Sequence, residues 1–264
     1  MNITQTFNPK NTPKLIGMEK HFEFLKFLIV NDKLPKVSLL SGEKGIGKST
    51  LVNHLMYFYF DKNNYDSKKY SITQESVFYK QYLKNFFPNT IYLESSALIN
   101  IKVDDIRLLK EKIFKSSMSD SKRFIILDDV ETFNINSLNA LLKIIEEPSS
   151  KNYFILINNK TKPLLETIKS RCLETKVIVN NETKLKILSY LIDFYNQELV
   201  LDSKTLNLSP GNLIKFNYIF SKHNIDMNKS FLDNLKTLIN IYKKEKDIFY
   251  KDLLIFFTEY YIDK

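Results

Sequence analysis

Residues 38–51 read SLLSGEKGIGKSTL, and this stretch decides the fold predicted for the chain. It holds three of the five glycines in the 264-residue sequence. Gly42, Gly47, Lys48 and Ser49 match the pattern G-x-x-x-x-G-K-[ST] of a phosphate-binding loop, or P-loop. An apolar run precedes the loop and a helical pattern follows it, which is the context that such a loop requires. The alternative is a chance glycine-rich turn.

Each residue type in this loop suits a nucleotide site. Glycines let backbone N–H groups approach phosphate oxygens, and the N-terminus of the following helix favours an anion. Lys48 is expected to reach the outer phosphates of ATP, and Ser49 to offer its hydroxyl to Mg²⁺. The loop residues predicted to bind the nucleotide are Gly42, Glu43, Lys44, Gly45, Ile46, Gly47, Lys48, Ser49 and Thr50.

The pattern around the loop predicts an α/β fold, with a parallel sheet flanked by helices. Strands are expected at 36–40, 90–94, 123–129, 153–158 and 175–179, and helices at 18–30, 48–60, 103–114, 134–148 and 163–172. Residues 61–90 show poor periodicity and are expected to form a surface excursion. The strand signal ends near Val179, so an all-helical part is predicted after it.

The charge and apolar content limit the partners and the location expected for this protein. Lys and Arg total 39 against 30 Asp and Glu, a net charge of +9, which favours a polyanionic partner such as nucleic acid. The alternative is that a chain rich in Lys, Asn and Ile is basic by compositional habit. No run of about eighteen apolar residues occurs, so no membrane span is expected and a cytoplasmic protein is predicted.

Cysteine and histidine give no metal-site pattern. Cys172 is the single cysteine, so this chain can build neither a disulfide framework nor a cysteine zinc cluster. The three histidines, His21, His54 and His223, are scattered without metal-ligand spacing.

Two carboxylates follow the apolar strand FIIL. Asp128 stands where a P-loop nucleotidase holds the magnesium shell, so it is predicted to act with Mg²⁺ and the nucleotide. Asp129 would orient the attacking water, but its side chain is one methylene shorter than glutamate and would sit back from that water. The alternative is an Asp pair that caps the next element.

Residues 128–172 read DDVETFNINSLNALLKIIEEPSSKNYFILINNKTKPLLETIKSRC and resemble the core of bacterial clamp-loader subunits of the AAA+ class. Those subunits show an N-A-L-L-K-x-x-E-E-P helix followed by an S-R-C ending. LIGMEKH at 15–21 and IKVDDIR at 101–107 resemble the same family at the expected places. Together these motifs span most of residues 13–175. Within the family, the sequence looks closest to the delta-prime subunits of the DNA polymerase III clamp loader.

The resemblance implies roles for single residues. Arg171 matches the arginine that acts in trans on ATP bound by a neighbouring subunit, and Asn159 matches the polar sensor 1 position. Lys102 and Arg107 match positions that face the DNA backbone. The alternatives are a cation at a helix C-terminus for Arg171 and a solvated helix face for the other two. Cys172 is expected to be a buried packing residue.

The sequence also departs from the family pattern. The cysteine zinc module of the family is replaced by residues 61–90, so no structural metal is predicted. In the lid motif, Gly211 is followed by Ile214 and Lys215 where an arginine is expected. The implied parts are an AAA+ P-loop core at 1–179, a helical lid at 180–222 and a short helical C-terminal collar region at 223–264.

The resemblance implies a subunit that helps to load the sliding clamp onto primed DNA during replication. It would bind ATP with Mg²⁺, hydrolyse it weakly or not at all, and supply Arg171 to a neighbour. Implied partners are tau/gamma-type and delta-type clamp-loader subunits, the sliding clamp and primer-template DNA. One alternative is an active AAA+ motor ATPase, which should carry Glu at position 129 and an arginine in the lid. Another is a basic nucleic-acid-binding protein with a vestigial P-loop.

Overall fold

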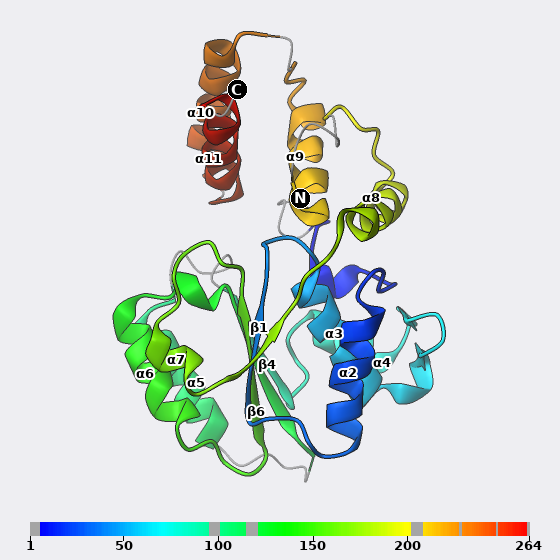
Figure 1. The fold of residues 1–264 in the computed structure, drawn as a ribbon, viewed down its shortest axis with the longest axis vertical. Helices are drawn as coiled ribbons and strands as arrows, with labels where there is room; N and C mark the ends of the chain where they lie inside the picture. The colour runs from blue at the N-terminus through cyan, green and yellow to red at the C-terminus, as the bar shows by residue number, and fades with distance from the viewer. Residues whose placement is uncertain are drawn as a thin grey trace. The chain divides into compact units, whose positions relative to one another are not determined.

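The computed structural model divides the chain into two compact units. It describes residues 6–94, 101–114, 121–201, 208–226, 229–246 and 248–262. One unit runs from Asn8 to Lys184, and the other comprises Leu185 onward together with Phe7. The first unit is an α/β unit and the second is helical (Figure 1). The predicted boundaries at 179 and 222 stay predictions.

A five-stranded parallel sheet forms the centre of the α/β unit, in the order β4-β5-β6-β1-β7. The strands are β1 (Val37–Ser41), β4 (Thr90–Glu94), β5 (Arg123–Asp128), β6 (Asn152–Asn158) and β7 (Leu173–Lys176). β1, β5 and β6 are buried along their whole length, as their continuous apolar runs predict for a sheet covered on both faces. The predicted α/β P-loop sheet flanked by helices is therefore confirmed.

Helices cover both faces of this sheet (Figure 1). One core forms with α2 (Glu19–Val30) and α3 (Lys48–Phe60), and the other with α5 (Val103–Phe114), α6 (Ile135–Ile145) and the short α7 (Glu166–Lys169). Neighbouring residues of β5 separate to the two cores, because successive side chains of a strand point to opposite faces. Phe124 and Ile126 join the first core, while Ile125 and Leu127 join the second.

Residues 61–90, here called the aromatic segment, are not the surface excursion that their poor periodicity predicts. They form a short hairpin of β2 (Tyr65–Asp66) and β3 (Ser71–Ile72), then α4 (Val77–Leu83). Four of their aromatic side chains are buried in the first core: Tyr65, Phe78, Tyr79 and Tyr82. These four rings therefore anchor the segment to the core of the α/β unit, while most of its other residues are exposed or half-buried.

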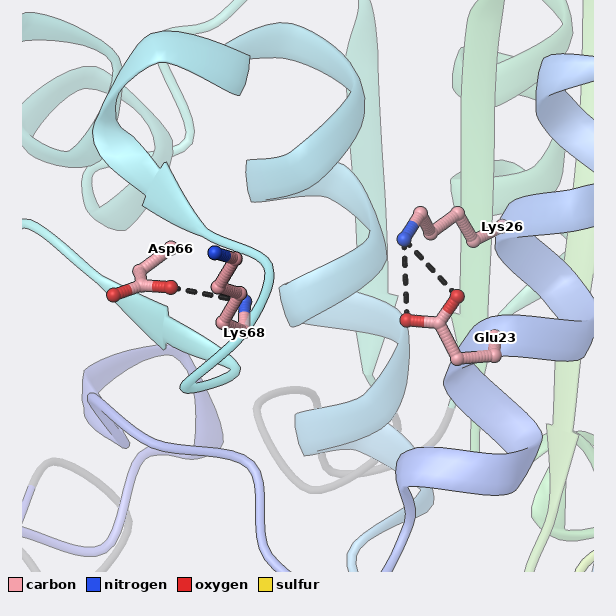
Figure 2. Close-up of polar contacts among 4 residues, drawn as sticks. All are labelled: Glu23, Lys26, Asp66 and Lys68. Atoms are coloured by element: carbon pink, nitrogen blue, oxygen red, sulfur yellow. Dashed lines mark hydrogen bonds and ion pairs between the residues drawn. The ribbon is translucent and has the colours of Figure 1, made fainter.

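Figure 2 shows two local polar contacts, one in the β2–β3 hairpin and one on the neighbouring helix α2. In the hairpin turn, the Asp66 carboxylate accepts the backbone N–H of Lys68 at 2.9 Å. On α2, Glu23 and Lys26 form an ion pair at 3.0 Å, one helical turn apart. An exposed pair of this kind contributes only about 0.5 kcal/mol, so burial of the aromatic rings is the larger stabilising effect.

The helical unit contains α8 (Asn181–Tyr195) from Leu185 onward, α9 (Pro210–Lys222), α10 (Phe231–Glu245) and α11 (Ile248–Ile262). α9 begins with Pro210, which suits the first position of a helix, and the Ser230 hydroxyl caps α10 by accepting the N–H of Asp233. The ring of Phe216 on α9 packs 5.3 Å from that of Phe249 on α11. Among the described residues after 180, the regular structure is helical, as predicted.

The last strand differs from its prediction. We expected it at 175–179, but β7 comprises Leu173–Lys176. Beyond the strand, the N–H of Val177 still donates to Ser41 O at 2.7 Å. Among the described residues, no helix has both the length and the apolar character that crossing a membrane requires.

Candidate nucleotide-binding site

The P-loop lies at the carboxyl end of a central strand. β1 ends at Ser41, the loop follows, and α3 begins at Lys48. In the sheet β1 stands between β6 and β7, and all three strands are parallel. Ligands of open parallel sheets bind beyond the carboxyl ends of the strands, so the loop occupies the expected edge.

The backbone of the loop requires glycine at three positions. A Cβ atom at Gly42 would lie 2.4 Å from the carbonyl oxygen of Val177. Gly45 and Gly47 have φ angles of 84° and 104°, in the left-handed region that side chains rarely adopt. Gly47 is also the N-cap of α3, so the loop conformation sets the direction of that helix N-terminus.

Lys48 is a buried cation held by the loop itself. The residue is 2% exposed, and its Nζ donates to Gly42 O at 2.8 Å and to Glu43 O at 2.7 Å. Burial lowers the pKa of Lys48 to about 8, although the Asp128 and Glu131 carboxylates oppose this shift. The ammonium therefore stays largely charged at neutral pH, beside the carbonyl groups of the loop.

Ser49 and Asp128 meet at this edge, although they are distant in sequence. The Ser49 hydroxyl donates to Asp128 Oδ2 at 2.5 Å, and Asp128 is 4% exposed. A hydroxyl and a carboxylate oxygen are hard donors of the type that Mg²⁺ prefers, and Mg²⁺ commonly binds one or two protein oxygens together with phosphates. This donor pair fits the Mg²⁺ that accompanies a nucleotide.

Asn159 binds the acidic pair. Its Nδ2 donates to Asp129 Oδ1 at 2.6 Å and to Asp128 Oδ1 at 3.3 Å. Asp129 is buried and has a left-handed backbone, with φ 55° and ψ 37°. The carboxylate of Asp129 is thus held by Asn159, which directly follows β6.

Sequence reasoning missed Glu131. This residue is buried, and its carboxylate accepts the N–H of Asn159 at 3.1 Å and the hydroxyl of Thr161 at 2.8 Å. Glu131 therefore fixes the backbone on which Asn159 sits. A signal was present, since Asp128, Asp129 and Glu131 place three carboxylates within four residues after a buried strand.

Sequence reasoning also missed Tyr92. Its hydroxyl donates to Asp128 Oδ2 at 3.0 Å, from β4. In the sequence, Tyr92 is an aromatic residue within the apolar strand TIYLE, and such a residue predicts packing. No motif signalled it.

The other predicted loop residues have mixed surroundings. Ile46 is buried at 2% exposure, and Thr50 is half-buried in the first turn of α3. Glu43 forms an ion pair with Lys184 on α8 at 2.6 Å. Lys44 is half-buried in the loop.

Arg171 contacts a different set of residues, in the turn after α7. Its Nη2 lies 2.7 Å from Glu146 Oε1, and its Nη1 donates to Thr167 O at 2.9 Å. The side chain is 37% exposed. The adjacent Cys172 has its pKa raised to about 11 by burial, and its Sγ donates to Ile168 O, as expected for a packing residue.

Lys102 and Arg107 are exposed at the start of α5. The N–H of Lys102 donates to Asp105 Oδ2 at 2.7 Å, and Arg107 pairs with Asp104 at 2.9 Å. Neither contact involves the P-loop, and neither cation pairs with Asp128 or Ser49 in these contacts. Within the described ranges, no cluster of three or more His, Cys, Asp or Glu side chains suitable for a metal ion occurs.

Several known proteins are similar in sequence to this chain. The family model described as DNA polymerase III, delta subunit, matches residues 17–179. The chain is 26% identical over 237 residues to the DNA polymerase III subunit gamma of Buchnera aphidicola subsp. Schizaphis graminum, a match that covers 85% of this chain and 63% of that protein. It is 46% identical over 70 residues to the delta-prime subunit of the same organism, covering 26% of this chain and 21% of that protein.

A solved structure also matches the chain. It is a DNA polymerase III gamma-subunit-related protein of Thermotoga maritima, with a TM-score of 0.44 and 18% identity. The match covers 81% of this chain and 76% of that one.

Proposed function

This chain belongs to the family described as DNA polymerase III, delta subunit, and from that premise we propose that it is a clamp-loader subunit that binds ATP with Mg²⁺. The observation that carries the proposal is the meeting of Ser49 and Asp128 at 2.5 Å, beside the buried ammonium of Lys48. Together they offer one cation for phosphate and two hard oxygens for Mg²⁺. A metal ion held by these two protein oxygens would neutralise negative charge on the phosphates of the nucleotide.

Hydrolysis by this chain alone is proposed to be weak or absent. The Asp129 carboxylate is short, and Asn159 holds it at 2.6 Å. Ile214 stands where the lid pattern expects an arginine, and it is 1% exposed in the core of the helical unit. The chain therefore offers no cis arginine at that position to stabilise charge on a transferring phosphoryl group.

Arg171 is proposed to act on the ATP of a neighbouring subunit. A guanidinium fixed near a γ-phosphate stabilises the charge that develops there during transfer. The described contacts of Arg171 lie at Glu146, Thr167 and Ser170, and its exposed side chain is accessible to a partner. These features support a role outside its own P-loop.

The test of this role uses the complex assembled with tau/gamma-type and delta-type subunits. Arg171→Ala should lower ATP hydrolysis at the affected site by about 10³-fold or more, the usual effect of removing an arginine finger. ATP binding by the isolated Arg171→Ala chain should be unchanged in calorimetry. Lys169→Ala is the matched control, because Lys169 is a half-buried, ion-paired cation at the end of α7, two residues before Arg171.

Two results would contradict the trans role. One is loss of ATP binding by the isolated Arg171→Ala chain, and the other is equal ATPase activity of the Arg171→Ala and Lys169→Ala complexes.

Loading of the sliding clamp onto primer-template DNA is the proposed outcome of this ATP use. Lys102 and Arg107 are exposed on one helix start and are proposed to contact the DNA backbone. Contacts to phosphates release counterions, so removing both cations should lower the salt dependence of DNA binding by the complex. An unchanged salt dependence of the double variant would exclude both contacts.

The second candidate is an active motor of the tau/gamma type. It is favoured by the similarity to the gamma subunit, which extends over 85% of this chain. Single-turnover measurement on the isolated chain separates the two candidates. If the isolated chain turns over ATP as fast as an assembled loader, it is a motor subunit. That result would contradict the proposal that its own hydrolysis is weak or absent.

A further inference from the structure

Tyr92 reaches the nucleotide site from a strand outside the P-loop. In the pairing of β4 with β5, Glu94 stands opposite Asp128 and Tyr92 stands opposite Ile126. Residues two apart on a strand point to the same face, so Tyr92 and Asp128 share one face of the sheet. The Tyr92 hydroxyl spans this diagonal and donates to Asp128 Oδ2 at 3.0 Å.

The ring of Tyr92 is itself fixed by a buried cation. Lys10 is 5% exposed, and its Nζ lies 4.4 Å from the centre of the Tyr92 ring. The same Nζ lies 4.6 Å from the Tyr82 ring and donates to Asn85 Oδ1 at 2.6 Å. A desolvated cation over an aromatic face is attracted to it, which favours one orientation of the ring.

The Asp128 carboxylate receives donors at both oxygens. Oδ2 accepts the hydroxyls of Ser49 and Tyr92, and Oδ1 accepts the N–H of Asp129 at 2.9 Å and the amide of Asn159 at 3.3 Å. Donors on both sides restrict rotation of the carboxylate. Tyr92 is the donor to Oδ2 that comes from β4.

We infer that Tyr92 is a positioning residue for Mg²⁺ binding, because its hydroxyl holds the Asp128 carboxylate in the orientation that a nucleotide-bound Mg²⁺ requires. The inference rests on the proposed nucleotide site. Outer hydrogen-bond partners of this kind change metal affinity by about 10–100-fold when they are removed.

The experiment compares ATP binding by the full chain in excess Mg²⁺ and in EDTA, using calorimetry. Tyr92→Phe removes the hydroxyl and keeps the ring against Lys10. We expect it to weaken ATP binding about tenfold in Mg²⁺ and to leave binding in EDTA unchanged. Tyr59→Phe is the matched control, because Tyr59 is a half-buried tyrosine of α3 whose ring packs on Phe60 and Phe124.

Asp128→Asn separates failure of the inference from failure of the proposed function. If Asp128→Asn loses the effect of Mg²⁺ but Tyr92→Phe behaves as the wild type, the nucleotide site stands and the role of Tyr92 is wrong. Equal weakening of Tyr92→Phe in Mg²⁺ and in EDTA marks a general structural role and also overturns the inference. If the wild type binds no ATP in either condition, the proposed function fails and the inference fails with it.

Discussion

At Lys48, burial and charge act on one ammonium in opposite directions. Burial favours the neutral amine and lowers the pKa to about 8, while the carboxylates around it favour the charged form. Because the folded pKa is below the usual value of 10.5, the unfolded chain holds more protons on Lys48 between pH 8 and pH 10.5. The free energy of unfolding contributed by this residue therefore rises with pH across that window.

A comparison with Lys48→Met tests this sign. Relative to the variant, the wild type should gain stability between pH 8 and pH 10.5, by on the order of 3 kcal/mol in total. Urea unfolding of both chains at several pH values measures the difference, and the titration of other groups largely cancels between them. A difference that is flat across the window would contradict a lowered pKa. If Lys48 binds phosphate as proposed, ATP binding by the wild type should weaken over the same window, because its ammonium loses a proton.

At the scale of the element, the aromatic segment is held by rings that meet across long sequence separations. Tyr82 of α4 is 1% exposed and lies 5.3 Å from the rings of both Tyr57 and Phe78. Its hydroxyl donates to Asn53 Oδ1 at 2.7 Å. The segment is thus anchored to α3 by the edge-to-face contact of Tyr82 with Tyr57, by burial and by one buried hydrogen bond.

Tyr82→Ala should lower the free energy of unfolding by about 3–5 kcal/mol, since it removes a large buried ring. Chemical denaturation followed by circular dichroism measures this loss. Phe86→Ala is the control in the same segment: Phe86 is 75% exposed, so its loss should change stability by less than about 0.5 kcal/mol. Similar effects of the two substitutions would mean that α4 is not packed as described.

Elements with a strong period could be predicted from the sequence, and those held by distant contacts could not. β4 and α3 have the predicted bounds, because each is a run of apolar residues between clear breaks. β7 begins two residues and ends three residues before its predicted bounds, because it is a largely exposed strand at the edge of the sheet with little burial pattern to define its ends. The aromatic segment has two-residue strands and a seven-residue helix, which are too short to show a period.

In the candidate site too, contacts that follow from local motifs could be predicted, and contacts that depend on the packing of distant strands could not. Ser49 and Asp128 could be paired in advance, because each ends a motif at the same edge of a parallel sheet. The contact of Tyr92 with Asp128 depends on strand register and on the direction of one hydroxyl. A single sequence encodes neither of these as a local pattern.

At the scale of the whole molecule, the two units have separate hydrophobic cores. The helical core contains Ile214, Phe216 and Leu253, all nearly without exposed area. The sheet cores are built from other residues. Separate cores predict that damage to one unit leaves the other folded.

Ile214→Asp tests this independence, because it buries an unpaired carboxylate in the helical core at a cost of about 4 kcal/mol. Hydrogen exchange should then lose its protection in α9, α10 and α11, while β1, β5 and β6 keep theirs. Leu232→Asp is the control, since Leu232 is 62% exposed on α10. Equal loss of protection in the sheet would show that the units unfold as one.

The left-handed backbone of Asp129 constrains how this site could evolve. Aspartate is among the few non-glycine residues that tolerate this conformation, because its short side chain can bond locally. Glutamate at the same φ of 55° would bring a longer side chain and lose that tolerance, so it would add backbone strain at this position. A single substitution to Glu at position 129 is therefore disfavoured unless the neighbouring turn changes with it.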